Sequence, residues 1–329
     1  MKIGFITPNY PGERRIALLP GDMEQTKGDI VLEEGFGHAM NIPDSAYKGC
    51  TFLSRADVFK TCDAIFSLKL LQEIDYKYLR QGQMILGWTH PLGSGKAFFE
   101  GIAQEKSLKI VDLDNIHPMA YYHDKSKLID FIPKNFIWKN SKNAGIASCL
   151  HALISLGSLP DSSTRVAILS SGNVAQGAFD LFSKFHCDIR MFYRKTMNEF
   201  VDTFPEYDII VNCIELADRS QHILTKADLR RVKRGALIID AAADPGYAID
   251  GIHLTSIDRP LYYKDGKHVY AVNNAPSVLY RQASRDISKS LSTYIFNEDV
   301  QRFWDFFDQF TKKSMTSNLF SEMNTSAAS

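Results

Sequence analysis

Four basic side chains in the first third of the chain stand where a parallel α/β sheet would present them for chemistry. Lys69 ends the apolar run 63–69, His90 follows the run 83–89, and Arg14 and Arg15 follow the run 2–7 within "ERRIALLP". Arginine binds carboxylates through paired hydrogen bonds. Lysine and histidine exchange protons when their surroundings bring their pKa values near neutrality. The pattern indicates a site that holds a carboxylate and moves protons. Surface salt bridges for the arginines, a solvated lysine and a turn histidine are the alternatives.

The elements that must position these side chains are two series of short apolar runs. Each series is spaced widely enough for helices between its strands, which predicts parallel α/β sheets. Ligands bind such sheets outside the carboxyl ends of the strands. The first series comprises 2–7, 29–35, 63–69, 83–89 and 108–114, and the second comprises 165–170, 188–193, 208–214, 235–244 and 268–272.

Helical patterns at 143–159 and 276–296 bracket the second series. We therefore predict two doubly wound parallel-sheet domains, with a Rossmann nucleotide-binding domain inserted into the other. The substrate domain would comprise 1–140 plus 278–329, and the nucleotide domain 141–277.

The stretch "RVAILSSGNVAQGAF" (165–179) resembles a dinucleotide-binding turn between strand and helix. That turn usually reads G-x-G-x-x-G or G-x-G-x-x-A. Here Gly172 and Ala175 fill the second and third positions, but Ser170 replaces the first glycine. A plain strand–turn–helix is the alternative. The expected cofactor-binding residues of this turn are Ser170, Ser171, Gly172, Asn173 and Val174.

The next strand ends in "MFYRKTMNEF", which places Arg194 and Lys195 where NAD-binding chains carry an acid. A cationic pair suits the 2′-phosphate of NADPH. We therefore expect both residues to bind NADPH, with solvated surface charges as the alternative.

Two acidic positions are further candidates. Asp244 ends the run 235–244 and would face the substrate from the nucleotide domain, whereas Asp240 lies inside that run and is the weaker candidate. The segment "DLDNIHPMAYYHD" (112–124) carries polar groups at Asp114, His117, Tyr121 and Tyr122. No spacing singles one out, so a structural loop is the preferred interpretation.

Composition excludes several other classes. The 329 residues carry 38 basic and 38 acidic side chains, so net charge gives no case for nucleic acid or a membrane surface as partner. No apolar window approaches a membrane span, and no secretory signal is expected. The five scattered cysteines fit neither a metal site nor a disulfide framework, so we expect a cytoplasmic protein without metal. The segment 300–310 places four phenylalanines on one helical face, for core packing or subunit packing in a homo-oligomer.

Taken together, "MKIGFI…ERRIALLP", the strands before Lys69 and His90, and "IIDAAADPG" resemble the alanine dehydrogenase and lysine-forming saccharopine dehydrogenase family. "GWTHPLGSG" (87–95), "SGNVAQGAF" (171–179) and "YAVNNAPSVLYRQAS" (270–284) are most similar to its shorter branch, the N5-(carboxyethyl)ornithine synthases. The resemblance spans about residues 1 to 300. It implies an inserted Rossmann domain, and assigns the 2-oxo acid carboxylate to Arg15.

The resemblance also assigns substrate contact and acid–base work to Lys69 and His90, a substrate-facing role to Asp244, and an active-site loop position to Asn274. Ser170 and the pair Arg194 and Lys195 fit the NADPH-using synthases better than the NAD-using alanine dehydrogenases. The expected reaction is NADPH-dependent reductive condensation of pyruvate with the side-chain amine of ornithine or lysine. The product would be an N-(1-carboxyethyl) amino acid. Alanine dehydrogenase activity, saccharopine dehydrogenase activity and a non-catalytic NADP-binding sensor are the alternatives.

Overall fold

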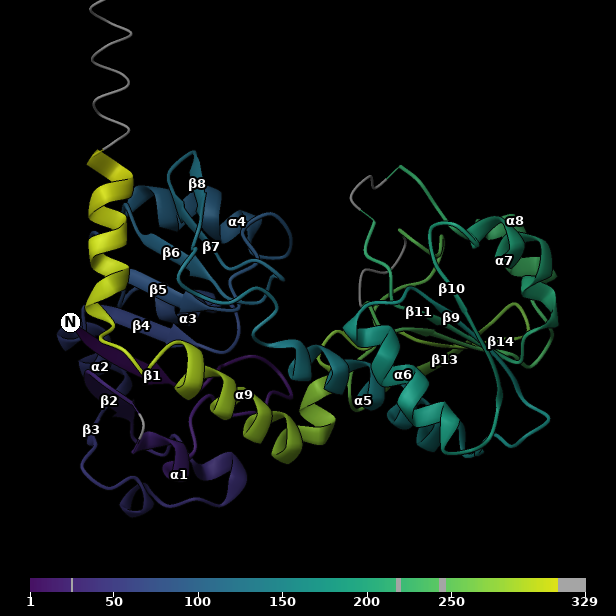
Figure 1. The fold of residues 1–329 in the computed structure, drawn as a ribbon, viewed down its shortest axis with the longest axis horizontal. Helices are drawn as coiled ribbons and strands as arrows, with labels where there is room; N and C mark the ends of the chain where they lie inside the picture. The colour runs from purple at the N-terminus through teal and green to yellow at the C-terminus, as the bar shows by residue number, and fades with distance from the viewer. Residues whose placement is uncertain (25, 217–219, 243–246, 313–329) are drawn as a thin grey trace, which may run out of the picture. The chain divides into compact units, whose positions relative to one another are not determined.

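The computed structural model describes residues 1–24, 26–216, 220–242 and 247–312, which divide into two compact units (Figure 1). Unit 1 consists of Met1–Pro11, Arg15–Ile137 and the chain from Ile287 onward. Unit 2 consists of Gly12–Arg14 and Trp138–Asp286. The sequence placed the domain boundaries near residues 140 and 278, and in the structure the chain passes between the units at 137/138 and 286/287.

Unit 1 is built on a sheet whose order, within the described residues, is β3-β2-β1-β4-β5-β6-β7-β8. All pairings from β3 to β6 are parallel, and β7 and β8 are antiparallel additions. The strand order reverses between β1 and β4, which makes their carboxyl ends the switch point of a doubly wound sheet. The strands are β1 (Lys2–Ile6), β2 (Asp29–Glu33), β3 (Thr51–Leu53), β4 (Ala64–Ser67), β5 (Met84–Gly87), β6 (Lys109–Asp112), β7 (Met119–Tyr122) and β8 (Lys125–Leu128).

The central strands of unit 1 are apolar because helices and loops cover both faces. Every residue of β4 and β5 is buried. Phe5 stacks on Phe66 with ring centroids 4.8 Å apart, and Phe296 meets both rings edge-on. The short helical elements are α1 (Pro20–Met23), η1 (His38–Met40), η2 (Asp44–Ala46), α2 (Arg55–Thr61), α3 (Glu73–Tyr76), α4 (Lys96–Phe98) and η3 (Phe99–Ala103).

Unit 2 has a second mainly parallel sheet, in the order β10-β9-β11-β12-β14-β13. Only the pairing of β13 with β14 is antiparallel among its described strands. The switch point lies between β9 and β11. The strands are β9 (Arg165–Leu169), β10 (Asp188–Phe192), β11 (Ile209–Asn212), β12 (Leu237–Asp240), β13 (Leu261–Lys264) and β14 (Lys267–Tyr270).

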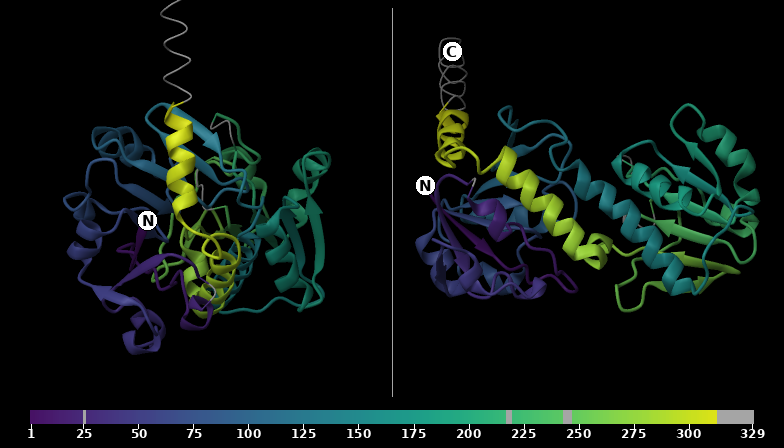
Figure 2. Two further views of the ribbon diagram at one scale, coloured as in Figure 1. Left: turned by 60° about the vertical axis from the view of Figure 1, so that its left-hand side comes forward. Right: turned by 60° about the horizontal axis from the view of Figure 1, so that its bottom comes forward.

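Helices α5 (Trp138–Leu156) and α6 (Asn173–Ser183) pack closely because glycines face the contact. A Cβ added to Gly145 would lie 1.9 Å from the carbonyl oxygen of Val174, and one added to Gly177 would lie 2.0 Å from that of Lys142. The other helical elements are α7 (Met197–Thr203), η4 (Phe204–Glu206), α8 (Lys226–Arg231), η5 (Ala275–Leu279) and α9 (Tyr280–Tyr294), the last seen from two further directions in Figure 2.

The predicted fold class, two doubly wound parallel-dominated α/β sheets, is confirmed. Each predicted run contains a strand, whereas β3, β7, β8 and β13 were not predicted. The aromatic segment forms a helix at 301–312, where Phe303 and Phe307 are buried in unit 1 and Phe131 contacts Phe303 edge-on. Within the described part of the chain, no helix is both long and apolar enough to span a bilayer.

Candidate active site

The ends of three neighbouring strands in unit 1 carry the polar groups of the candidate site. Lys69 follows β4, His90 follows β5 and Asp114 follows β6. These strands are adjacent and parallel, so their carboxyl ends lie at one edge of the sheet. The sheet order therefore brings together three residues that are far apart in sequence.

His90 and Asp114 form an ion pair, with Nε2 of His90 3.1 Å from Oδ2 of Asp114. Their side chains are 33% and 25% exposed. Burial alone would lower the pKa of His90, but the charge and hydrogen bond of Asp114 raise it above its ordinary value. Burial alone would raise the pKa of Asp114, but the charge and hydrogen bond of His90 hold it below its ordinary value. The pair therefore favours imidazolium and carboxylate.

The backbone of His90 is held in a left-handed conformation, with φ of 43°. Its carbonyl oxygen accepts hydrogen bonds from the N–H groups of Gly93 (3.0 Å) and Gly95 (2.9 Å). A Cβ on Gly95 would lie 1.9 Å from the carbonyl oxygen of Thr89, so only glycine fits there. The segment "GWTHPLGSG" is thus a tight loop that presents the histidine.

Asp112 supports this loop from the end of β6. Its Oδ1 accepts hydrogen bonds from the backbone N–H groups of Thr89 (3.2 Å) and His90 (3.4 Å), and its Oδ2 accepts one from Asn115 Nδ2 (2.5 Å). The residue is fully buried, and burial raises its pKa. Asp112 therefore holds the His90 backbone, and Asp114 holds the ring.

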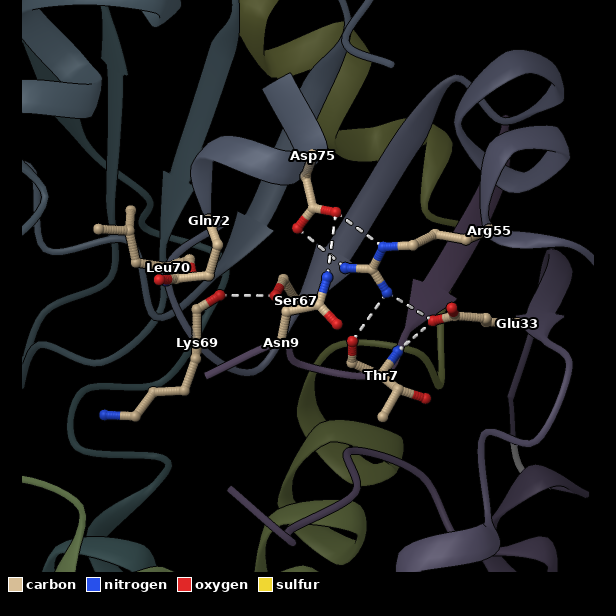
Figure 3. Close-up of polar contacts among 9 residues, drawn as sticks. All are labelled: Thr7, Asn9, Glu33, Arg55, Ser67, Lys69, Leu70, Gln72 and Asp75. Atoms are coloured by element: carbon tan, nitrogen blue, oxygen red, sulfur yellow. Dashed lines mark hydrogen bonds and ion pairs between the residues drawn. The ribbon is translucent and has the colours of Figure 1, made fainter. Parts of the chain in front are cut away.

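Lys69 lies at the switch point, where its backbone carbonyl accepts a hydrogen bond from Ser67 Oγ at 2.5 Å (Figure 3). Its Nζ lies 4.7 Å from the centroid of the Tyr10 ring. The positive charge of Lys69 opposes protonation of His90, lowering its pKa, and helps to lower the pKa of Asp114. Lys69 is therefore electrostatically coupled to the histidine–aspartate pair.

Arg15 is 3% exposed, and its charge also lowers the pKa of Asp114. Unit 1 thus brings Arg15, Lys69 and His90 into one electrostatic cluster around Asp114. The sequence pattern did not predict a role for Asp114 in the site, because its segment was interpreted as a structural loop. The available signal was its position just after a strand, which it shares with Lys69 and His90.

The predicted cofactor turn lies in unit 2, between β9 and α6. Ser170 has a φ of 121°, and its Oγ accepts a hydrogen bond from the N–H of Gly172 at 3.1 Å. Gly172 caps α6, and Ser171 and Gly172 are exposed. The Ser170 hydroxyl therefore stabilises the turn by accepting a hydrogen bond from the backbone two residues later. Asn173 and Val174 begin the helix and are half-buried.

Arg194 and Lys195 lie just after β10, the strand beside β9. Both are exposed in a turn closed by a hydrogen bond from the N–H of Thr196 to the carbonyl of Tyr193, 2.7 Å long. The serine–glycine turn and this cationic pair therefore follow adjacent parallel strands of one sheet.

Asn274 precedes η5 and is 2% exposed. Its carbonyl accepts a hydrogen bond from the N–H of Ser277 at 3.0 Å. The Ser277 hydroxyl donates to Gly12 O and accepts from Arg14 N–H, both at 2.7 Å. The Arg14 guanidinium lies 3.8 Å from the centre of the Tyr280 ring. Arg14 is thus held within unit 2, whereas Arg15 belongs to unit 1.

The two aspartates of the second-domain prediction have different outcomes. Asp244 lies outside the described residues. Asp240 is buried within the sheet, where its Oδ1 accepts a hydrogen bond from Asn212 Nδ2 at 2.9 Å. Among the described residues, no three His, Cys, Asp or Glu side chains gather in a metal-binding arrangement.

Family models match both parts of the chain: the N-terminal domain of alanine dehydrogenase/PNT over residues 8–120 and its C-terminal domain over 153–314. An N(5)-(carboxyethyl)ornithine synthase from Clostridium botulinum is 52% identical over 93% of this chain and 97% of its own length. The chain belongs to the alanine dehydrogenase/PNT family, with the N(5)-(carboxyethyl)ornithine synthases.

A second relative of that name, from Lactococcus lactis subsp. lactis, is 51% identical over 92% of this chain and 98% of its own length. A solved L-alanine dehydrogenase superposes with a TM-score of 0.72 at 18% identity, covering 90% of this chain and 89% of its own, which shows a shared fold. Members of the alanine dehydrogenase/PNT family are oxidoreductases that use a nicotinamide cofactor. The family resemblance seen in the sequence motifs is therefore confirmed.

Proposed function

We propose that the chain condenses pyruvate with the side-chain amine of ornithine or lysine, using NADPH as reductant. The reaction would consume the oxo acid, the amine, NADPH and one proton, and would release water, NADP⁺ and the N-(1-carboxyethyl) amino acid. The cluster of Arg15, Lys69, His90 and Asp114 in unit 1 carries the proposal, because it combines a carboxylate-binding cation with proton-transferring groups. The names of the 50–52% identical relatives support the same reaction.

Arg15 would bind the pyruvate carboxylate through its planar guanidinium, which fixes the direction of the neighbouring carbonyl. The attacking amine has a free pKa near about 10.4, so it must lose a proton before it forms a bond to that carbonyl carbon. The resulting carbinolamine must then lose its hydroxyl as water to give the imine. Two proton transfers are therefore required at the substrate.

His90 suits the acid step, because Asp114 raises its pKa and keeps the ring charged to higher pH. With Nε2 held by Asp114, the ring would release its proton from Nδ1 to the departing hydroxyl. Lys69, at the switch point beside it, would take part in the other transfer, from the attacking amine. Arg15 and Asp114 would orient these groups without exchanging protons themselves.

The residues of unit 2 fit NADPH. The exposed residues Ser171 and Gly172 directly precede a helix of eleven residues, and such helix ends bind phosphate. Arg194 and Lys195, after the adjacent strand, would hold the 2′-phosphate. Bound NADPH supplies the hydride that reduces the imine carbon. Asn274 and Asp244 remain proposed substrate-facing residues on the strength of the family resemblance.

One panel tests the proposal: NADPH oxidation with pyruvate plus ornithine, pyruvate plus lysine, pyruvate plus ammonia, and 2-oxoglutarate plus lysine. We expect turnover with pyruvate and one diamino acid, and mass spectrometry should show the N-(1-carboxyethyl) product. Lys69→Met is the negative control, because methionine keeps an unbranched side chain and lacks the amine. Turnover only with ammonia or only with 2-oxoglutarate would assign alanine or saccharopine dehydrogenase activity instead. Silence throughout, with NADPH bound, would favour a sensor.

We also propose a cytoplasmic location. All five cysteines are free, and Cys62 and Cys149 are buried, as suits a reducing compartment. Cell fractionation with antibody detection tests this, and recovery outside the cytoplasmic fraction would refute it.

A further inference from the structure

One side chain that contacts the Lys69 ammonium is a tyrosine from the other side of the switch point. Tyr10 lies in the segment after β1, and Lys69 follows β4, the strand paired with β1. The Nζ atom lies 4.7 Å from the Tyr10 ring centroid, within the range of a cation–π interaction. Nothing in the sequence pattern singled out Tyr10.

The segment that leads to Tyr10 is held by Arg55, at the start of α2. Arg55 donates from Nη1 to the backbone carbonyl of Thr7 at 2.9 Å, and from the same nitrogen to Oε2 of Glu33 at 2.8 Å. Glu33 Oε2 in turn accepts the N–H of Thr7 at 2.7 Å. Both backbone polar groups of Thr7 are therefore fixed by one ion pair (Figure 3).

The other face of Arg55 is bound to Asp75. Nε and Nη2 donate to the two carboxylate oxygens at 2.7 and 2.9 Å, in the paired geometry that arginine and carboxylate favour. Asp75 Oδ1 also accepts a hydrogen bond from Asn9 Nδ2 at 3.3 Å. The Asp75 side chain is 1% exposed and that of Arg55 is 16% exposed. We call Arg55, Glu33 and Asp75 the Arg55 bracket.

The Arg55 bracket places three charged side chains in a partly buried position, which a loop that only connects two elements does not require. Removing one partner from such a partly buried network leaves another charge without compensation. Burial alone would lower the pKa of Arg55, but the two carboxylates raise it, so the guanidinium stays charged. The bracket fixes Thr7 and Asn9, two of the three residues before Tyr10. Figure 3 shows the Lys69 side chain pointing away from the bracket, beyond Ser67.

We propose that Tyr10 is a positioning residue, whose ring holds the Lys69 ammonium at the switch point, and that the Arg55 bracket sets where this ring stands. Tyr10 acts through Lys69 and does not itself exchange a proton with the substrate. The catalytic meaning of this placement rests on the proposed function. The placement itself is a property of unit 1 and is measurable without turnover.

The charged groups around Lys69 act in opposite directions. Asp114 attracts the ammonium, His90 repels it, and the Tyr10 ring face attracts it; Arg15 is a further cation that acts on Asp114. Removing the ring removes one attraction, worth about 0.5–2 kcal/mol for cation–π pairs, so the unprotonated amine becomes more populated at a given pH. Because that form is the nucleophile, Lys69 should then react faster with an acylating reagent.

The experiment is competitive acetylation with acetic anhydride across pH, with Lys69 and Lys77 quantified by peptide mass spectrometry in the same digest. Tyr10→Leu should raise the Lys69 acetylation rate at pH 8 by about 2- to 30-fold, which is the cation–π energy expressed as a population. Tyr10→Phe retains the ring and should keep the wild-type profile. The matched control is Tyr78→Leu, which removes a similar pair, Lys77 Nζ over the Tyr78 ring at 4.9 Å, and should leave Lys69 unchanged.

Arg55→Lys tests the bracket, because lysine keeps the charge but cannot contact Thr7, Glu33 and Asp75 together. It should change Lys69 acetylation in the same direction as Tyr10→Leu and leave Lys77 unchanged. Thermal unfolding of each variant identifies any that fail to fold, and Tyr10→Phe and Arg55→Lys are the mild substitutions that remain informative. Unchanged Lys69 profiles in both Tyr10→Leu and Arg55→Lys would overturn the proposal, as would equal effects of Tyr10→Phe and Tyr10→Leu.

Turnover gives the second readout. With the active substrate pair, Tyr10→Leu should lower kcat by about 5- to 30-fold with little change in the KM of NADPH, because the Lys69 amine is no longer held in place even though more of it is unprotonated. Tyr10→Phe should retain most of the wild-type kcat. If acetylation responds as expected while no substrate pair is turned over, the proposed function fails and the positioning role stands. If turnover is present and acetylation does not respond, the positioning role fails alone.

Discussion

Replacing Asp114 by asparagine should lower the pKa of His90, because it removes the charge that raises it while keeping the shape of the side chain. For unit charges 3.1 Å apart, Coulomb's law gives about 1.3 kcal/mol at the dielectric constant of water and about 5 kcal/mol at a value of 20. These energies correspond to about one and about four pKa units.

The expected shift lies near the lower value. The His90 side chain is 33% exposed and that of Asp114 25%, so water screens the pair. Asp112, whose charge also raises the pKa of His90, remains in the variant. We therefore expect the His90 pKa to fall by about one to two units.

The assay is NMR titration of ¹³C-labelled histidine rings, with His90 assigned by His90→Gln. The pH profile of kcat should change in the same direction, so the limb that belongs to His90 should move to lower pH by the same amount. Asp63→Asn is the matched control, because Asp63 is exposed and precedes β4, at the amino end of the strands. It should leave the His90 pKa unchanged. A shift below about half a unit in Asp114→Asn, or an equal shift in Asp63→Asn, would refute the electrostatic argument.

The same pair predicts how stability depends on pH. Because folding raises the pKa of His90, its ion pair stabilises the folded protein fully below the pKa that His90 has in the unfolded chain. This stabilisation is lost as the pH rises through the pKa of His90 in the folded protein. Because folding lowers the pKa of Asp114, its ion pair stabilises the folded protein fully above the pKa that Asp114 has in the unfolded chain. This stabilisation is lost as the pH falls through the pKa of Asp114 in the folded protein. The difference in unfolding free energy between wild type and Asp114→Asn should therefore peak between about pH 4 and 6.5, the two reference values.

Three further perturbations test the remaining assignments. Lys69→Met and His90→Gln should each lower kcat by about 10²- to 10⁴-fold and leave NADPH affinity, measured by fluorescence titration, unchanged; near-normal turnover in both would remove them from the chemistry. The double variant Arg194→Ala/Lys195→Ala should weaken NADPH binding by at least about tenfold and spare NADH, because charge-assisted contacts to the 2′-phosphate would be lost. Equal weakening of NADPH binding and NADH binding would instead indicate that the turn carrying Arg194 and Lys195 no longer forms. Ser170→Ala should destabilise the protein by about 1 kcal/mol through loss of the hydrogen bond to Gly172 N–H, whereas Ser170→Gly should cost less because glycine relieves the φ of 121°. Denaturant unfolding measures both, and the reverse order would contradict the argument from backbone strain.

The main strands could be predicted because buried parallel strands are short, continuous apolar runs. The four-residue strand Ala64–Ser67, entirely buried, is such a case. Strands β3 and β8 were not predictable in this way. Thr51–Leu53 has three residues and Lys125–Leu128 carries two lysines, so neither shows an apolar run, and both owe their conformation to their neighbours.

The candidate site could be predicted only in its individual parts. Lys69 and His90 were identifiable from their position after apolar runs. Their coupling to Asp114 depends on β5 pairing with β6, and their relation to Tyr10 depends on β1 pairing with β4. Strand order is a tertiary property that no local pattern carries. The left-handed φ of His90 was equally hidden, because it occurs in a loop that is closed by hydrogen bonds from Gly93 and Gly95 to the His90 carbonyl.

The contact of Phe296 with Phe5 and Phe66 has a consequence for how this chain is made. The β1 and β4 strands leave the ribosome early, but the ring that completes their core is encoded some 230 positions after Phe66, beyond all of unit 2. At roughly 5–20 residues per second, about 10–50 s pass in which these two phenylalanines lack the Phe296 ring. Unit 2 is one nearly continuous segment and is free to fold in that interval. The first sheet synthesised would therefore be the last to finish, when Phe296, two residues after α9, has emerged.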